Sequence, residues 1–225
     1  MRRASIIALL LAAATPAAAQ QADQGFTFGL RTGIAFAGGD IAGDPASSQT
    51  AKLADDFKSV VPLVLEAGFR FSGVTLGLYY QYGFASLDDQ MPLGSGECAQ
   101  PGFKCDSGRV KRLGVQLTRP FPNPSATPWI GAGLGWEWAS WDETDGVDSV
   151  SFTYKGLELM GQGGVEFLVS PKFYVGPYAS ISLARYSEVQ FKGGGMSGSV
   201  DFDQAGLDEK WHEWFQVGVR ARFDL

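Results

Sequence analysis

The chain has 225 residues, of which 45% are hydrophobic, 13% aromatic and 19% charged, and its formal net charge is −6. This length allows one domain with a sizeable core, and 30 glycines beside short apolar runs favour β structure over helices. The acidic balance excludes nucleic acid as an expected partner, because phosphate binding needs a basic surface.

Residues 1–19 are predicted to be a cleavable export signal. Arg2 and Arg3 form a basic start, residues 6–14 form a short apolar run, and residues 17–19 are alanines that suit cleavage. The run is too short for a helix that spans a bilayer, which takes about 20 apolar residues. The mature domain is therefore expected to cover residues 20–225. An exported chain without later membrane helices is either soluble or a β-barrel.

The mature chain contains eight segments with the two-residue alternation of β-strands, which predicts an all-β, eight-stranded antiparallel up-and-down transmembrane barrel. The segments lie at residues 25–37, 59–71, 74–86, 108–121, 129–141, 153–169, 173–187 and 211–225. Short connections follow the second, fourth and sixth segments, and long polar ones, such as 38–58 and 188–210, follow the odd-numbered segments. This asymmetry is typical of outer-membrane barrels and predicts that both termini are periplasmic.

The two faces of these segments differ in chemistry. One face is apolar, as in Val61, Leu63 and Leu65, and it is expected to carry Arg119 as its only charged residue. The other face is rich in glycine and contains five arginines and four glutamates. These charges are predicted to pair inside the barrel as one hydrogen-bonded network. Its predicted members are Arg31, Glu66, Arg70, Arg112, Glu137, Glu158, Glu166, Arg220 and Arg222.

Alternation alone does not decide which face points outward, because a soluble lipocalin-like barrel turns its apolar face inward around a ligand. The volume of the interior favours the apolar face outward. Eight strands leave a lumen just wide enough for side chains, and it could hardly enclose Tyr80, Trp136 and Trp138 with all the aliphatic groups. Glycines such as Gly131, Gly133 and Gly135 on the other face suit a crowded lumen.

Aromatic residues on the apolar face gather near both ends of the segments, which matches the two interfaces of a membrane. Near the short turns are Phe26, Phe28, Phe71, Phe121, Phe167, Phe173 and Phe223, and near the long loops are Phe36, Tyr82, Phe84, Trp136, Trp138 and Trp211. A scattered soluble core predicts no such bands.

This pattern resembles the small eight-stranded outer-membrane barrels of the OmpA/OmpX type over essentially the whole mature chain. The last segment, residues 216–223, is similar to the C-terminal signal of such barrels, with a polar residue, Gly218, an apolar residue and Phe223 in the expected order. That family usually ends on Phe or Trp, whereas this chain adds Asp224 and Leu225. The resemblance implies an outer-membrane location. It also implies contact with outer-membrane lipid, with lipopolysaccharide and with the barrel-assembly machinery, and no cofactor.

Cys98 and Cys105 are the only cysteines, and both follow the third segment. In an exported protein they are predicted to form a disulfide, which would stabilise the fold by roughly 2–3 kcal/mol. Free or metal-bound thiols are the alternatives.

His212 is the only histidine, and it is predicted to lie at the membrane interface or the rim of the lumen. Its neighbour Glu213 faces the other way, so no catalytic arrangement of nucleophile, base and orienting group is expected. Acidic loop residues such as Asp142, Glu143 and Asp208 are interpreted as solvated charge, because their spacing does not match a Ca²⁺ loop. The sequence therefore predicts no catalytic residue and no metal site.

The sequence favours a non-enzymatic barrel with a side-chain-filled lumen that serves envelope integrity or surface interaction through its outer loops. An alternative is a narrow transporter for small or hydrophobic molecules. A lipid-modifying enzyme and a soluble ligand carrier are less favoured. The fold by itself does not decide among these four functions. The extracellular ligand is not indicated.

Overall fold

A computed structural model describes residues 24–44, 49–87, 104–121, 126–144 and 148–225. The strands are β1 (Gly25–Asp44), β2 (Gln49–Lys52), β3 (Phe57–Phe71), β4 (Val74–Leu87), β5 (Lys104–Pro120), β6 (Thr127–Thr144), β7 (Ser149–Ser170), β8 (Phe173–Gly193), β9 (Met196–Asp201), β10 (Asp208–Glu209) and β11 (Trp211–Asp224). One short helix, α1, covers Leu53–Asp56. Within the described ranges, no helix is long and apolar enough to cross a bilayer. The predicted signal peptide lies outside these residues.

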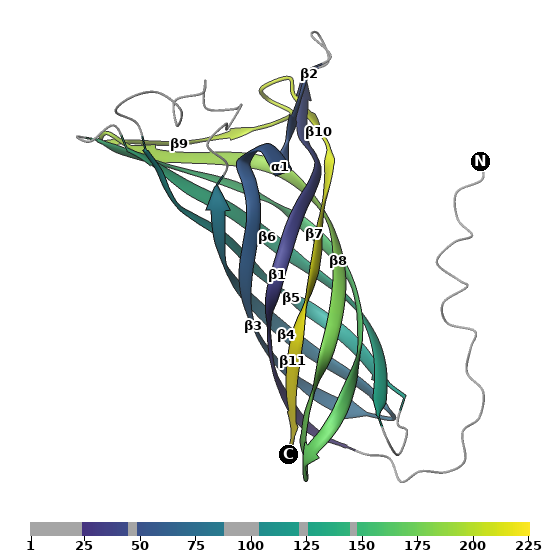
Figure 1. Cartoon of the computed structure of the whole chain (residues 1–225). Coiled ribbons are helices and arrows are strands. Elements are labelled where there is room, and N and C mark those ends of the chain that lie inside the picture. Colours follow the sequence, from purple (N-terminus) through teal and green to yellow (C-terminus); the bar gives the residue numbers. More distant parts are fainter. Residues whose placement is uncertain (1–23, 45–48, 88–103, 122–125, 145–147) are drawn as a thin grey trace, which may run out of the picture.

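Eight long strands form a closed antiparallel ring, which confirms the predicted barrel (Figure 1). The order around the ring is β1, β3, β4, β5, β6, β7, β8 and β11, and β11 pairs back with β1. Each residue can be followed to its pairing partner on the next strand, once around the ring. The path that starts at Phe28 of β1 returns to β1 at Gly38, ten residues further along the chain. The residues on this path are Phe28, Ala67, Leu78, Val115, Leu134, Leu159, Leu183, Glu213 and Gly38. This stagger requires the strands to tilt, as Figure 1 shows.

The short turns and the C-terminus share one end of the barrel, called the lower end here (Figure 1). Ser72 and Gly73 both have positive φ, 47° and 75°, as the tight hairpin between β3 and β4 requires. The amide of Leu225 donates to the carbonyl of Phe26 at 2.9 Å, and that of Asp224 donates to the carbonyl of Lys172 at 2.9 Å. These bonds fasten the last strand to the start of β1 and to the β7–β8 turn.

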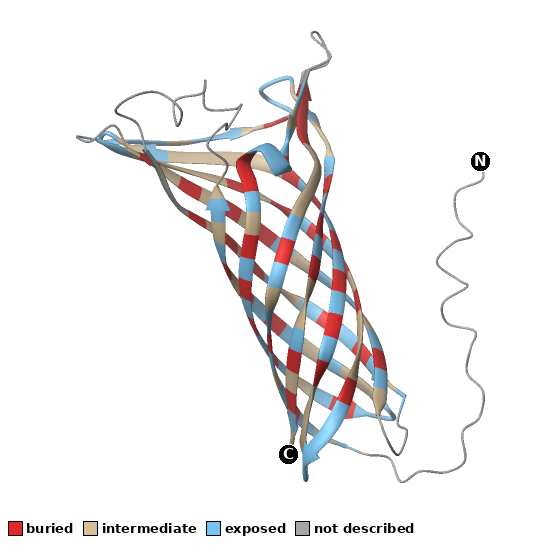
Figure 2. Cartoon of the chain, in the orientation of Figure 1, coloured by how far each residue is buried: buried red, intermediate tan, exposed pale blue. Residues whose placement is uncertain are grey.

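Burial alternates along each long strand (Figure 2). Leu65 is 54% exposed, whereas the next residue, Glu66, is 7% exposed. The apolar face therefore points outward and the polar face lines the lumen, as predicted.

The prediction that long polar loops, such as 38–58 and 188–210, lie opposite the lower end was wrong in large part. β1 continues to Asp44 and β8 to Gly193, while β2, α1, β9 and β10 lie within the predicted loops. β9 pairs with β8, and β10 pairs with β1. The described parts of residues 40–57, 141–154 and 187–210 are called the upper extension here (Figure 1). Polar loop residues pair as strands because the ladders of the barrel continue past its apolar band.

In the upper extension the outward face of the wall is polar and the inward face is apolar, which is the reverse of the arrangement below it. In the lower part of β7, Leu157 and Leu159 are exposed and Glu158 is buried. Above them, Tyr154 is buried inside the barrel and Phe152 packs against buried residues. The pairing of β6 with β7 runs from Thr127 to Thr144 without a register shift. The same side of β7 is therefore apolar below and polar above.

Candidate functional site

Glycines on β5 and β6 make room for a large side chain that crosses the lumen. A Cβ added at Gly135 would overlap the hydroxyl of Tyr79, and one at Gly114 would lie 2.6 Å from the Tyr79 ring. The Tyr79 hydroxyl reaches Glu158 and donates to its Oε2 at 2.9 Å. The glycines that the sequence placed in the lumen therefore make space for interior side chains.

Glu66 is the centre of the lower lumen. Its carboxylate accepts a hydrogen bond from Nε of Arg220 at 2.7 Å and lies 3.2 Å from Nε of Arg31. It also accepts one from Nε2 of Gln116 at 2.6 Å. These partners come from β11, β1 and β5, so one carboxylate on β3 connects four strands of the ring.

Glu166 extends this arrangement towards the lower end. It accepts hydrogen bonds from Nη1 of Arg220 at 2.9 Å and from Nε of Arg222 at 2.8 Å. Arg222 also pairs with Asp224, which accepts from Nη2 of Arg70 at 2.9 Å. The lower network is defined as Arg31, Glu66, Arg70, Glu166, Arg220, Arg222 and Asp224. The sequence prediction omitted Asp224, although this residue lies within the predicted segment 211–225 and on the same face as Arg220 and Arg222.

A second group, the middle network, lies around Arg112. Its Nε lies 2.8 Å from Oε2 of Glu137, and its Nη1 lies 3.1 Å from Oε1 of Glu158. Oε1 of Glu137 accepts hydrogen bonds from the Tyr186 hydroxyl and from Nε1 of Trp214, the latter at 3.1 Å. All three charged side chains are fully or almost fully buried.

The structure thus places all nine residues of the predicted charge network inside the barrel, in two groups. With Asp224, the lower and middle networks together hold five arginines and five carboxylates, so the charges of these two networks balance. Balance matters because an unpaired buried charge costs several kcal/mol.

His212 lies deeper than predicted. It is fully buried, and its Nε2 lies 3.0 Å from Oε1 of Glu137. Its ring centroid lies 4.1 Å from that of Tyr186, and its Nδ1 has no partner among the described residues. The prediction that His212 lies at the membrane interface or the rim of the lumen was wrong. The contact that places it deeper is with Glu137, which is 75 residues away in the chain. Strand alternation cannot predict such a contact.

Above the middle network, aromatic side chains fill the lumen. This upper cluster is defined by Phe57, Trp141, Tyr154, Tyr186, Phe202 and Trp214, with Ile41 and Leu53 among its aliphatic members. The rings of Tyr154 and Tyr186 stack with centroids 5.2 Å apart, and Trp141 lies 5.2 Å from Tyr154. The sequence interpretation missed this cluster. Ile41, Leu53, Phe57 and Phe202 fall in residues 38–58 and 188–210, which were assigned to loops, and the other four lie on the strand faces that were expected to be polar.

Asp56, at the end of α1, is buried beside the upper cluster. Neither of its carboxylate oxygens has a hydrogen-bond partner in the described part of the chain. Burial, together with the negative charges of Asp55 and Glu143, raises the pKa of Asp56 from 3.8 to about 7. The carboxyl of Asp56 is therefore partly protonated at neutral pH.

Several acidic residues assigned to solvated loops have partners instead. Asp142 pairs with Arg109, and buried Glu143 accepts from Nε1 of Trp141 at 3.0 Å. Glu209 pairs with Arg185. Among the residues described, no group of three or more His, Cys, Asp or Glu is placed to hold a metal ion.

The predicted disulfide stays a prediction. Cys98 lies outside the described residues, and for Cys105 only its place in β5 is described.

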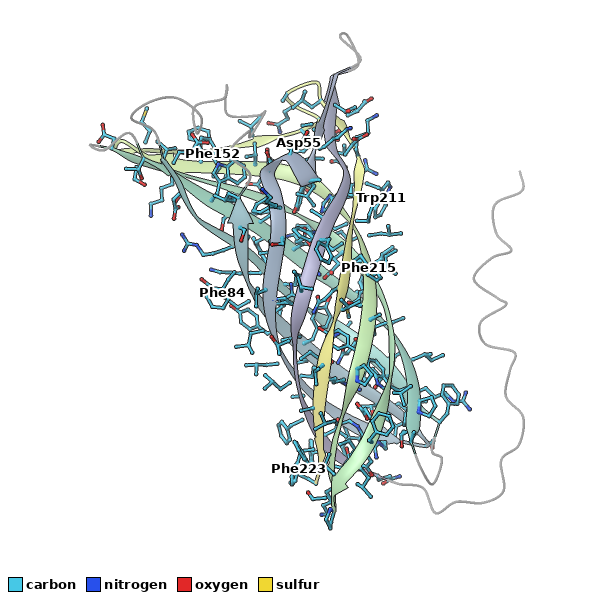
Figure 3. The ribbon with its side chains drawn as sticks, in the orientation of Figure 1. Asp55, Phe84, Phe152, Trp211, Phe215 and Phe223 are labelled. Atoms are coloured by element: carbon cyan, nitrogen blue, oxygen red, sulfur yellow. The ribbon has the colours of Figure 1, made fainter. Side chains whose placement is uncertain are left out.

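The outer wall carries aromatic residues towards both ends. Phe26, Phe69 and Phe71 are exposed near the lower end, and Phe84, Trp136 and Trp211 are exposed towards the upper one. In Figure 3, Phe223 lies at the lower end and Trp211 towards the upper extension.

The sequence interpretation expected Arg119 to be the only charged residue on the outward face, and this expectation was wrong. At the upper end of the apolar band, half-buried Lys111 and Lys155 lie above Leu113 and Leu157 on the same face, and Glu213 is exposed.

Comparison with known proteins assigns the family. The family model described as "Outer membrane protein beta-barrel domain" matches residues 5–183. The chain belongs to this family. Its members are outer-membrane barrels, so the apolar outward face is the lipid-facing face. No curated protein matches the chain by sequence.

Two solved structures share the fold. Neisserial surface protein A has a TM-score of 0.55 at 15% sequence identity, and the match covers 92% of this chain and 100% of that one. A major outer membrane protein from Thermus thermophilus has a TM-score of 0.53 at 16% identity, over 88% of this chain and 99% of that one. At such identities the similarity extends to the barrel alone.

Proposed function

We propose that this outer-membrane barrel is closed and non-enzymatic, and that it serves envelope integrity or surface interaction through its upper extension. The filling of the lumen at three successive levels supports this proposal. Apart from half-buried Asp224, the lower network, the middle network and the upper cluster consist of buried side chains that contact one another across the ring. An eight-stranded barrel has no spare width for a channel beside such contents.

The proposed orientation places the lower end in the periplasm and the upper extension outside the cell, as short turns and long connections are placed in other outer-membrane barrels. The export signal at residues 1–19 and recognition of residues 216–223 by the assembly machinery belong to this proposal. So does contact of the outward face with membrane lipid and lipopolysaccharide.

Conductance tests the closed lumen. Purified protein in planar bilayers is expected to give no steady single-channel current. A variant in which Glu66, Arg220 and Glu166 are all replaced by alanine is also expected to give no steady current, because the middle network and the upper cluster still fill the lumen. Co-flotation of the protein with lipid vesicles checks that both proteins insert. Steady current through the unchanged protein would overturn the proposal.

The upper cluster favours one second candidate, a narrow transporter for small hydrophobic molecules, because it presents aromatic surface inside the wall. Uptake of a labelled monoaromatic compound by cells that express the protein tests this. Faster uptake that is lost in Trp141→Asp but kept in Lys172→Gln would favour transport over a closed barrel.

A lipid-modifying enzyme has less support. Among the described residues, His212 is fully buried beside Glu137 and Tyr186, so its ring does not reach the lipid-facing surface. Overexpression is expected to leave lipid A unchanged. Modified lipid A that disappears with His212→Ala would contradict a non-enzymatic role.

A further inference from the structure

One row of the outer wall brings two lysines to either side of a tryptophan. In the strand register, Tyr82 on β4 pairs with Lys111 on β5, Lys111 pairs with Trp138 on β6, and Trp138 pairs with Lys155 on β7. Neighbouring strands lie about 4.8 Å apart, so the two lysines flank Trp138 at a backbone separation of about 10 Å. Residues paired in a ladder share one face of the sheet.

This row marks the level where the outward face changes from apolar to polar. On β5, exposed Leu113, Val115 and Leu117 lie below Lys111 on the same face, and on β7, exposed Leu157 and Leu159 lie below Lys155. Aromatic and basic residues at such a level lie among lipid headgroups. The two lysines are therefore at the depth of the phosphates of the outer leaflet.

The two ammonium groups are available to an anion. Neither lysine takes part in an ion pair within the described ranges, whereas the nearby Arg109 pairs with Asp142. Nζ of Lys111 lies 5.6 Å from the centre of the Tyr82 ring, which holds it against the wall. Phosphate oxygens are the anionic groups that lipid headgroups present at this depth.

A polar groove continues from this row along the same face of the sheet. Thr153 and Ser151 lie above Lys155 on β7 and pair with Gln190 and Lys192 of β8. β9 adds Ser199 and Ser197 beside them. These six polar residues, together with Phe191 and Gly198, line a groove of about 430 Å³. Hydroxyl, amide and ammonium groups of this kind suit the hydroxyl groups of sugars.

We propose that the outer wall of β5 to β9 binds a phosphorylated glycolipid of the outer leaflet. Its phosphates contact Lys111 and Lys155 beside Trp138, and its sugars extend upward into the groove of the upper extension. This inference rests on the proposed orientation, with the upper extension outside the cell. It assigns contacts of the lipid headgroup that the fold by itself does not imply.

Glu188 competes with a lipid phosphate for the ammonium group of Lys155. It pairs with Lys155 in the β7–β8 register, and it accepts a hydrogen bond from Nε2 of Gln190 at 2.9 Å. Removing this carboxylate is expected to strengthen binding of an anion at Lys155. The variant Glu188→Gln therefore acts in the direction opposite to a lysine substitution.

The test measures lipid binding to the full mature barrel in detergent micelles by native mass spectrometry. The probes are bisphosphorylated lipid A, the same lipid without phosphates, rough lipopolysaccharide with core sugars, and inorganic phosphate. The variants are Lys111→Gln with Lys155→Gln, Glu188→Gln, and Gln190→Ala with Ser199→Ala. Lys172→Gln, on the turn at the lower end, is the matched control for loss of a lysine charge.

The double lysine variant is expected to bind phosphorylated lipid A about 10- to 30-fold more weakly, and Lys172→Gln is expected to match the unchanged protein. Glu188→Gln is expected to bind more tightly. The groove variant is expected to weaken binding of rough lipopolysaccharide and to leave lipid A unaffected. Inorganic phosphate is expected to bind weakly to every variant.

Equal binding of phosphorylated and dephosphorylated lipid, or equal loss in Lys172→Gln, would overturn the inference. Fractionation of the same variants separates this failure from failure of the proposed function. A protein that reaches the outer membrane but binds without regard to Lys111 and Lys155 contradicts the lipid site only. Absence from the outer membrane contradicts the proposed function itself.

Discussion

The lower network and the upper cluster fill the same tube by opposite means. Around Glu66 the lumen is held by directional ion pairs between buried charges, whereas around Trp141 it is held by stacked and tilted rings. The surroundings of the wall explain the difference. In the lipid-facing part, apolar residues are needed outside, so polar residues are left for the lumen. In the upper extension the outside is in water, and the interior is apolar, as in a soluble barrel.

The comparison predicts that each region tolerates a different kind of substitution. The ion pairs require each partner to be present, because a missing partner leaves a buried charge unpaired. The aromatic cluster requires volume and area, so a ring of similar size is an adequate replacement. The predictions below run from the largest expected effect to the smallest.

Glu66→Ala is expected to destabilise the barrel by about 3–5 kcal/mol, because it leaves Arg31 and Arg220 without their shared carboxylate. Denaturant unfolding in micelles, followed by loss of the compact gel band, measures this. The control is Asp208→Ala, which removes an exposed ion pair with Lys210 and is expected to cost less than about 1 kcal/mol. Equal effects of the two changes would refute the view of Glu66 as a centre of the lower network.

Trp141→Ala is expected to cost about 3 kcal/mol, because it opens a cavity against Phe57, Phe152 and Tyr154. Trp141→Phe is expected to cost only about 1 kcal/mol, since it keeps most of the ring volume. The same unfolding assay separates them. If Trp141→Phe were as damaging as Trp141→Ala, ring packing would not be what holds the upper extension.

Asp56→Asn is expected to stabilise the protein at high pH only. The pKa of Asp56 is raised to about 7, so the folded state binds a proton that the unfolded chain releases near pH 4. Stability contributed by this group is present at low pH and is lost as the pH rises through 7. The gain in Asp56→Asn is expected to reach about 2–4 kcal/mol at pH 8 and to vanish near pH 4. Melting temperatures across this range measure it, and a gain independent of pH would contradict the assignment.

Gly135→Ala is expected to cost about 1–3 kcal/mol, because the new methyl group would overlap the Tyr79 hydroxyl. Gly161→Ala is the matched control on β7, where an added Cβ would only touch Cγ2 of Ile181 at 3.8 Å. It is expected to be neutral or slightly stabilising. If both changes cost the same, loss of strand flexibility rather than crowding of the lumen would explain them.

Much of the lumen could be predicted from alternation, and the rest depended on the surroundings of the wall. Arg31, Glu66 and Arg220 were assigned to the interior because they alternate with lipid-facing residues. Tyr154 was missed as a lumen residue, because above the apolar band the polar face of the strand points outward, and Phe152 was missed because it lies just before the predicted segment 153–169. The same residues along the strand still point inward there, but the inward residues are apolar and the outward ones are polar.

The sequence by itself determined the number of long strands, the short turns of the lower end and the side of each strand that faces lipid. It did so because a pleated strand places alternate side chains on opposite faces and because lipid excludes charge. Only the tertiary structure decided which charges meet, that Asp224 joins them, that His212 contacts Glu137, and that the predicted loops continue the wall. Such contacts depend on the stagger of a closed ring, which brings together residues far apart in the chain.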